Sequence, residues 1–288
     1  MIGDVTAVVV IHDSAHVLPD CIAALSRDGV AALVVDNASG DAGPDLAERS
    51  GARVVRNARN EGFGRAMNIG VAAAATPWCL LTNPDLVYDP GAVALLMQAA
   101  ERWPDAGLLA PRIVEPDGRV FFQPDSLLAP APPNAPRQPL PEGDCCAGFL
   151  SGASLLVRRD LFLSMGGFDP SIFLFYEDDD LCRRMRDGGR ALVHVHDAVA
   201  RHGRGQSTAP KKGNAFRARW HLAWSKAYVS RKWGLPDPAR ATLLQNAPKA
   251  MASALFAPGR RERYAGSAAG AWAWLRGETA LGREGLSL

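Results

Sequence analysis

Apolar strand-like runs and helical segments alternate along the first 110 residues, and this alternation limits the possible folds more than any other feature. Val5–Ile11 is a continuous run dominated by β-branched residues, which is typical of a strand buried on both faces. The expected further strands are residues 31–35, 53–55 and 78–81, and the expected helices are residues 17–25, 46–50, 68–75 and 90–103. Because strands joined through helices pair in parallel, the pattern predicts an α/β fold with a mostly parallel central sheet flanked by helices.

The chain changes character twice after this region. Residues 124–141 contain seven prolines and predict a loop, because proline donates no backbone hydrogen bond. These are Pro124, Pro130, Pro132, Pro133, Pro136, Pro139 and Pro141. A strand at 154–157 and a helix at 159–165 are expected next, and after His202 the sequence becomes long helical stretches rich in Ala, Trp and Arg. We therefore expect an α/β domain over residues 1–208 and a C-terminal helical region over residues 209–288.

Composition places the chain among globular proteins. Of its 288 residues 48% are hydrophobic and 22% charged, which excludes disordered, collagen-like and fibrous classes. No run approaches the roughly 18 apolar residues of a membrane span, and the N-terminus lacks the basic region of an export signal. The five cysteines form no CxxC pair, so we expect reduced thiols and a cytoplasmic location.

Charge is divided unevenly along the chain. Residues 1–200 carry 16 Lys and Arg against 26 Asp and Glu, whereas residues 201–288 carry 16 against 4. This net charge of +12 in the second part favours an electrostatic role over an ordinary solvated face. The partners that fit are phosphates, carried by an anionic membrane surface, a diphosphate or a nucleic acid.

Polar side chains follow three of the expected strands at their carboxyl ends. His12 and Asp13 follow the first strand, Asp36 follows the second, and Asn83 and Asp85 follow the fourth. Ligands of parallel α/β sheets bind at this edge. A single Asp there is otherwise explained as a helix N-cap or an Asx turn, but three polar sites on one edge predict a binding site. Asp85 suits a hard divalent cation that bridges phosphate oxygens.

The segment 60–68 places small residues just before an expected helix. Here backbone N–H groups can approach a phosphate or a ribose closely. The segment fails as a dinucleotide fingerprint, because its GxG follows the third strand and the third glycine is absent. A Rossmann oxidoreductase is therefore disfavoured.

Four adjacent acids, residues 177–180, precede two arginines at an expected helix N-terminus. Negative charge at that end also compensates the helix dipole, which explains one or two of the four. Crowding of carboxylates raises the pKa of one member, as a general base requires. His202, which lies between this cluster and the basic tail, is a further candidate.

A series of six motifs resembles family 2 glycosyltransferases of the GT-A fold. The motifs are Asp36-Asn37-Ala38-Ser39-Gly40-Asp41, Asn60-Glu61-Gly62-Phe63-Gly64, Asn83-Pro84-Asp85, Gly166-Gly167-Phe168-Asp169, Glu177-Asp178-x-Asp180-Leu181-Cys182-x-Arg184 and His202-x-x-Gly205-x-Ser207. The likeness is strongest to bacterial rhamnosyltransferase-like and galactofuranosyltransferase-like enzymes and covers residues 5–235. It implies that residues 1–208 form a GT-A catalytic domain for inverting, metal-dependent sugar transfer.

The resemblance also implies roles for individual residues. Asp178 would be the general base that deprotonates the acceptor hydroxyl, and Glu177 would lie beside the donor sugar. A divalent metal, Mg²⁺ or Mn²⁺, would be held on the donor diphosphate by Asp85 and His202. The donor nucleotide would be bound by His12, Asp13, Asp36, Asn60, Gly62, Phe63, Gly64, Asn68 and Asn83.

Two departures from the family pattern bear on the donor. Asn83 stands where the family usually has the first acid of Asp-x-Asp, so Asp85 carries more of the metal binding. His12-Asp13 replaces the usual Tyr-Asn, which leaves the nucleobase open. We expect dTDP-rhamnose; the alternatives are a UDP sugar such as UDP-galactofuranose, or a non-catalytic nucleotide-binding module. A nucleic acid is not an expected partner, because nucleic-acid binding would not explain the acidic residues at the carboxyl edge of the sheet.

Aromatic residues recur at every fourth position in the basic tail. Phe216, Trp220, Trp224 and Tyr228 would form one stripe on a helix. The stripe either packs on the catalytic domain or lies in a lipid interface, as basic amphipathic helices with Trp do. Such a tail beside a cytoplasmic transferase site predicts that the acceptor is a cell-surface glycan or a glycan linked to a polyprenyl diphosphate. It also predicts peripheral contact with the cytoplasmic face of the inner membrane.

Overall fold

The computed structural model describes residues 2–133, 139–203, 205–209 and 211–288. Pro136 of the predicted proline-rich loop lies outside the described residues. Two compact units share the chain. The first, here called the sheet unit, comprises Met1–Glu61, Arg65–Phe168 and Asp178–Ala209. The second, the helical unit, comprises Gly62–Gly64, Asp169–Glu177 and Pro210–Leu288.

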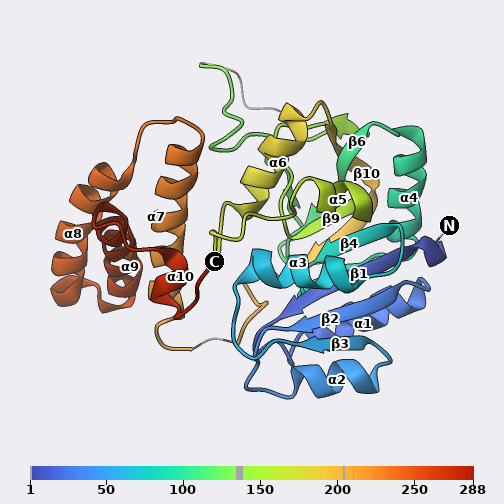
Figure 1. Cartoon of the computed structure of the whole chain (residues 1–288), viewed down its shortest axis with the longest axis horizontal. Coiled ribbons are helices and arrows are strands. Elements are labelled where there is room, and N and C mark those ends of the chain that lie inside the picture. Colours follow the sequence, from blue (N-terminus) through green and yellow to red (C-terminus); the bar gives the residue numbers. More distant parts are fainter. Residues whose placement is uncertain (1, 134–138, 204, 210) are drawn as a thin grey trace. The chain divides into compact units, whose positions relative to one another are not determined.

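The sheet unit is built on one mixed, mostly parallel sheet, as predicted (Figure 1). Its strands are β1 (Val5–Ile11), β2 (Ala31–Asp36), β3 (Arg53–Arg56), β4 (Trp78–Thr82), β5 (Leu86–Tyr88), β6 (Ala106–Val114), β7 (Val120–Phe121), β8 (Cys145–Cys146), β9 (Ser154–Arg158) and β10 (Ala191–His202). The main order is β3-β2-β1-β4-β9-β6-β10-β5. Strands β3, β2, β1 and β4 run parallel, β9 runs antiparallel to both of its neighbours, and β6 and β10 are parallel.

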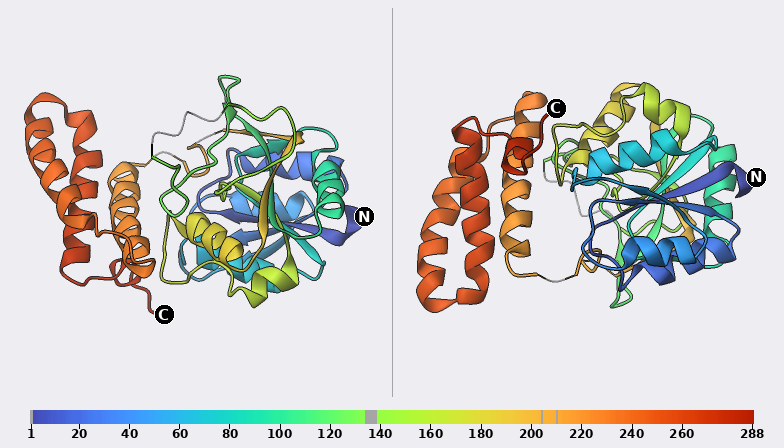
Figure 2. Two further views of the ribbon diagram at one scale, coloured as in Figure 1. Left: turned by 90° about the horizontal axis from the view of Figure 1, so that it is seen from above. Right: turned by 60° about the horizontal axis from the view of Figure 1, so that its bottom comes forward.

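Helices cover both faces of this sheet, which explains why β1 is buried throughout (Figure 2). Helix α1 (Leu18–Arg27) joins the core cluster that contains Val5 and Val9 of β1. Helix α3 (Phe63–Ala73) approaches the opposite face, where a side chain at Gly70 would collide with Val8. Since successive strand residues point to opposite faces, the two helices sandwich β1.

The remaining helices of the sheet unit follow the predicted order. They are α2 (Gly43–Arg49), α4 (Ala92–Arg102), α5 (Arg159–Ser164) and α6 (Glu177–Asp187), of which Glu177 belongs to the helical unit. Helix α3 begins at Phe63, five residues before the predicted start. The cause is local: Gly62 adopts a φ of 85°, which turns the chain, and Phe63 N–H is already satisfied by the Phe173 carbonyl at 3.0 Å.

The helical unit consists of α7 (Asn214–Lys232), α8 (Ala239–Phe256), α9 (Pro258–Leu275) and α10 (Ala280–Arg283). Glycines in α9 let α7 and α9 approach closely, because side chains at Gly266 or Gly270 would collide with the backbone of α7. Trp220 and Trp224 of the predicted aromatic stripe are only 2% and 3% exposed. They pack inside the helical unit against α9 and α10.

These two tryptophans therefore do not form a lipid-facing surface. Within the part of the chain that the structure describes, no helix combines the length and the apolar character needed to cross a membrane.

Candidate functional site

The loops after β1 and β2 are tied together at the carboxyl end of the sheet. His12 Nδ1 lies 3.1 Å from the Asn37 carbonyl oxygen. Asp13 receives a hydrogen bond from Gly40 N–H on Oδ1 (2.7 Å), and Asp36 receives one from Ser39 N–H on Oδ1 (2.9 Å). The structure therefore brings together three of the predicted nucleotide-binding residues, and Asp13 and Asp36 are both buried.

Backbone strain marks the same loops. Asp13 and Ala38 have φ angles of 56° and 61°, in the left-handed region that residues with a side chain rarely occupy. The Asp13 N–H is held by Ser39 Oγ at 3.0 Å, so the unusual conformation is fixed from both loops. Conformations of this kind are concentrated at ligand-binding sites.

Asn37 links the loops at the carboxyl end of the sheet, although no individual role was predicted for it. Its Oδ1 accepts hydrogen bonds from Glu61 N–H (2.9 Å) and Asn57 Nδ2 (3.1 Å). Its Nδ2 donates to Asn60 Oδ1 over 2.9 Å. Asn60 is thus joined to the Asp13 and Asp36 loops through Asn37.

Asp85 lies in the turn between β4 and β5, next to Asn83, and is 5% exposed. Ser207 Oγ donates to its Oδ1 at 2.6 Å, and His202 Nε2 lies 3.4 Å from the same oxygen. Burial raises the pKa of Asp85, but hydrogen bonds from His202 and Ser207 outweigh burial and leave the pKa lowered. Asp85 is therefore an ionised carboxylate at neutral pH, and the structure brings both predicted metal ligands together.

The surroundings of the second oxygen of this carboxylate show whether the site suits a metal ion. Asp85 Oδ2 is buried and has no hydrogen-bond partner among the described residues. A buried carboxylate oxygen without a hydrogen-bond partner suits a hard divalent cation, and His202 supplies a second metal-ligating atom. The described residues contain no group of three or more His, Cys, Asp or Glu that could hold a metal. Further ligands would then come from a bound diphosphate or water.

Asp178 occupies the first turn of α6 and is partly exposed. Gly152 N–H donates to its Oδ2 and Asp179 N–H donates to its Oδ1, each over 2.9 Å. Desolvation by the surrounding protein raises the pKa of Asp178 to about 6, against these hydrogen bonds, and the charge of Asp179 adds to the increase. A carboxyl group in this range exchanges a proton near neutral pH, as a general base must.

The other acids of the cluster differ in their surroundings. Asp179 holds the proline-rich loop by accepting hydrogen bonds from Ser126 Oγ (2.5 Å) and Leu128 N–H (3.2 Å). Asp180 pairs with Arg184 at 2.8 Å, and Arg184 in turn donates to the Gly167 carbonyl. These two acids therefore hold neighbouring segments of the fold in place. Glu177, the first residue of α6, is buried in the helical unit.

The loop residues Gly62, Phe63 and Gly64 belong to the helical unit. Gly62 is required by close packing, since a Cβ there would lie 2.5 Å from the Phe173 carbonyl oxygen. Asn68 lies in the sheet unit, where Nδ2 donates to the Phe168 carbonyl and Oδ1 accepts from Phe168 N–H, both over 2.8 Å. The Asn68 amide therefore fixes the Gly166-Gly167-Phe168 turn. Neither of its two hydrogen bonds connects Asn68 to His12, Asp13 or Asp36.

Comparisons with known sequences agree on one family. The sequence model of glycosyl transferase family 2 matches residues 6–163. The chain is 33% identical to the N-acetylglucosaminyl-diphospho-decaprenol L-rhamnosyltransferase of Mycobacterium tuberculosis (strain H37Rv), with 72% of this chain and 80% of that protein covered. It is 34% identical to the rhamnosyltransferase WbbL of Escherichia coli K12, with 31% of this chain and 33% of that protein covered.

Solved structures support the same fold. The mannosyltransferase PcManGT from Pyrobaculum calidifontis, in complex with GDP-Man and Mn²⁺, gives a TM-score of 0.57 at 18% identity, covering 94% of this chain and 87% of that one. GalNAc-T7 with UDP, GalNAc and Mn²⁺ gives a TM-score of 0.57 at 16% identity, covering 78% and 50%. The predicted GT-A fold is confirmed.

Proposed function

The chain belongs to glycosyltransferase family 2 and is an inverting glycosyltransferase that uses a nucleotide sugar, and we propose that the sugar is L-rhamnose carried by dTDP. The support is the 33% identity to an L-rhamnosyltransferase over most of both chains. The acceptor we propose is a glycan on a polyprenyl diphosphate, the class to which that relative's name refers. The product would be an intermediate of a cell-surface glycan.

The main support for the proposed reaction is the position and the raised pKa of Asp178. Its carboxylate is held by two backbone N–H groups, and its pKa is raised to about 6. A carboxylate placed in this way accepts a proton from a hydroxyl as the hydroxyl attacks. Among the acids of the cluster, Asp179 and Asp180 are engaged in holding the fold, so Asp178 is the proposed base and Glu177 its neighbour beside the donor sugar.

Asp85 and His202 would hold Mg²⁺ or Mn²⁺, and the cation would neutralise the charge that develops on the leaving diphosphate. The orphaned Oδ2 of Asp85 supports this assignment. The nucleoside would lie against His12, Asp13 and Asp36 at the carboxyl end of the sheet, with Asn60, which Asn37 joins to the same loops, beside it.

The transfer is a single in-line displacement. The acceptor oxygen forms a bond to the anomeric carbon as the bond from that carbon to the diphosphate oxygen breaks. The hydroxyl proton passes to Asp178, and dTDP leaves. Attack opposite the leaving group inverts the anomeric configuration.

We also propose that residues 1–208 form the catalytic domain and that the C-terminal region, 209–288, contacts an anionic membrane from the cytoplasmic side. The support lies on α7, α8 and α9. Arg219, Arg260 and Arg263 line one pocket with no acid in its wall, and none of the three forms an ion pair among the described residues. Nearby on α8, Leu244 and Met251 are 74% and 76% exposed. Exposed apolar side chains beside arginines favour a lipid interface.

The test is transfer by the purified protein from dTDP-rhamnose and from UDP-galactofuranose, each with Mn²⁺ and a synthetic glycan on a prenyl diphosphate. We expect one glycosidic bond of inverted configuration, formed from dTDP-rhamnose. If the protein transfers sugar from UDP-galactofuranose and not from dTDP-rhamnose, the proposed donor sugar is galactofuranose instead of rhamnose. Nucleotide binding without transfer from either donor would count against the proposed reaction.

A further inference from the structure

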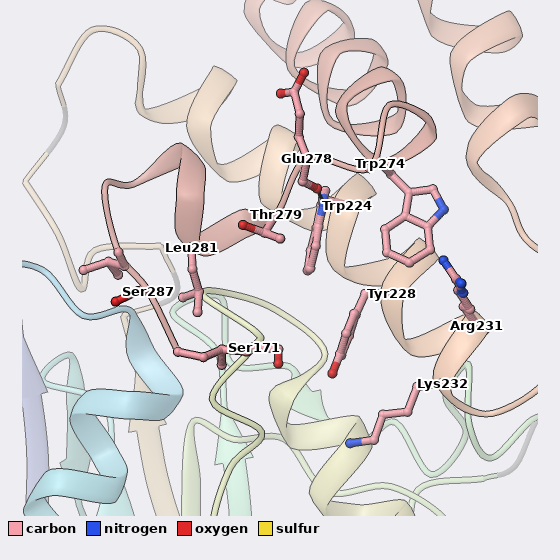
Figure 3. Close-up of a pocket in the computed structure, with 13 residues that line it drawn as sticks. Ser171, Trp224, Tyr228, Arg231, Lys232, Trp274, Glu278, Thr279, Leu281 and Ser287 are labelled. Carbon is pink, nitrogen blue, oxygen red and sulfur yellow. Dashed lines mark hydrogen bonds between the residues drawn. The ribbon is translucent and has the colours of Figure 1, made fainter.

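The helical unit contains a cavity of about 710 Å³ that the proposed chemistry does not use. All the residues that line it belong to the helical unit, chiefly to α7 and to the stretch from the end of α9 onward (Figure 3). Its volume lies within the range of pockets that bind compounds of a few hundred daltons. It is therefore large enough for the head and first units of a lipid, or for a short sugar.

One wall of the cavity is aromatic. Tyr228 stacks on Trp224 with ring centres 5.3 Å apart and an interplanar angle of 11°, and Trp274 meets Trp224 edge-on at 5.6 Å. Hydrogen bonds fix two of these rings: Trp224 Nε1 donates to the Glu278 carbonyl and Trp274 Nε1 to Asp237 Oδ2. Leu281 and Leu286 extend the apolar surface. This wall is preorganised for a planar or branched apolar group.

Cations lie at one side of the aromatic wall, whereas Leu281 lies at the other (Figure 3). The Arg231 guanidinium is 5.8 Å from the centre of the Trp274 ring and forms no ion pair among the described residues. Lys232 pairs with Asp169 at 2.7 Å. The acid that lines the cavity, Glu278, pairs with Arg276 at 3.4 Å and is directed away from the aromatic rings in Figure 3. The cationic side therefore favours an anion.

We infer that this cavity binds the prenyl diphosphate portion of a lipid-linked acceptor. The apolar aromatic wall would contact the first isoprene units, and Arg231 would bind the diphosphate, with Lys232 adding positive charge beside it. No simple sugar needs an unpaired guanidinium, and no free phosphate needs an aromatic wall, so the combination selects an amphiphile with an anionic head. The inference rests on the proposed function, because it assumes a lipid-diphosphate acceptor.

The chain itself connects the cavity to the proposed base. Ser171 lines the cavity, and Asp169 binds both Tyr228 Oη (2.9 Å) and Lys232. Both residues lie in the segment Asp169–Glu177, which continues directly into Asp178. Phe175 and Tyr176 in this segment have φ angles of 69° and 68°, so the entry to α6 is held in a strained conformation. Lipid bound in the cavity would thus contact the segment that leads into the catalytic helix.

Binding is tested directly by calorimetry with farnesyl diphosphate, in EDTA so that no metal-dependent diphosphate site contributes. We expect farnesyl diphosphate to bind at least about tenfold more tightly than farnesol or inorganic diphosphate, and Arg231→Gln to weaken it about tenfold. Arg231 is exposed, so this substitution leaves the fold intact. Trp274→Phe should weaken binding, whereas Trp272→Phe, on the same helix and 52% exposed outside the cavity, should not.

Equal affinity for inorganic and farnesyl diphosphate, or an unchanged affinity in Arg231→Gln, would overturn the inference. A kinetic measurement separates it from the proposed function. In Arg231→Gln the KM for a prenyl-diphosphate acceptor should rise about tenfold, with the donor KM unchanged and the KM for an alkyl glycoside acceptor unchanged. The wild-type enzyme could transfer sugar and yet prefer the prenyl-diphosphate acceptor over the alkyl glycoside no more than Arg231→Gln does. In that case the cavity proposal fails, while the proposed function stands.

Discussion

Gly152 donates its backbone N–H to Asp178 Oδ2 over 2.9 Å, and a Cβ added at position 152 would lie 3.0 Å from the Asp178 Cβ. The loop before β9 and the first turn of α6 therefore meet so closely that a methyl group at position 152 would push against the Asp178 side chain. The proposed base is oriented by a residue that is remote in sequence and whose one contribution is its backbone.

Gly152→Ala should reduce kcat about tenfold by displacing the Asp178 carboxylate slightly, while the thermal midpoint stays within a few degrees. The added methyl group would also come 3.3 Å from Oδ2, so the side chain must shift. Gly143→Ala is the matched control, because no heavy atom lies within 4 Å of its added Cβ. Equal activity of the two variants would show that Gly152 does not position Asp178.

Asp178→Asn should lower kcat by about 10²–10⁴-fold, because the amide cannot accept the hydroxyl proton. Binding of dTDP, followed by calorimetry with Mn²⁺, should remain within a factor of about two, since the donor residues are untouched. Asp187→Asn, at the exposed end of the same helix, serves as the control for helix charge. Near-normal turnover in Asp178→Asn would reject the residue as the base.

The pH profile should report the same group. Because the base must be ionised and the pKa of Asp178 is raised to about 6, kcat/KM should fall tenfold per pH unit below pH 6 and level off above it. Steady-state rates measured between pH 4.5 and 8.5, at substrate concentrations well below KM, test this pH dependence. A plateau that continues down to pH 4.5 would place the pKa of the base in the ordinary range of a carboxyl group.

Asp85→Asn should abolish the metal-dependent part of nucleotide binding. With dTDP and Mn²⁺ at about 100 times the dissociation constant, the wild-type midpoint should rise several degrees. His202→Ala should retain part of this rise, and Asp89→Asn, which removes an exposed pair with Arg201, should retain all of it. A full rise in Asp85→Asn would exclude this carboxylate as a metal ligand.

A half-buried carboxylate in the helical unit, Glu284, predicts an acid-sensitive fold. Burial raises the pKa of Glu284, but hydrogen bonds from His221 (2.8 Å) and Arg217 (2.7 Å) outweigh it and hold the pKa at about 2. A lowered carboxyl pKa stabilises the fold above the unfolded value of 4.5, and this stability is lost as the pH falls toward 2. Urea unfolding should show that Glu284→Gln lowers stability at pH 7 more than Glu278→Gln does, and that the difference narrows below pH 4.

The sequence by itself determined the α/β class, the order of the first four strands and their helices, and the edge of the sheet on which His12, Asp13, Asp36 and Asp85 lie. These features follow from short-range patterns. A β-branched run buried on both faces leaves few alternatives to a parallel strand, and polar residues at its carboxyl end are brought to one edge by that topology.

Only the tertiary structure decided which polar groups meet. No periodicity predicts that Asn37 joins three loops, that Gly152 orients Asp178, or that Ser207 and His202 share Asp85 across more than 110 residues of chain. The aromatic stripe was visible in the sequence, but its burial against α9 was not, because a helical pattern shows which side chains share a face and leaves open what covers it. Contacts between distant segments depend on packing of the whole core, and this decides which acid holds the fold and which remains available for chemistry.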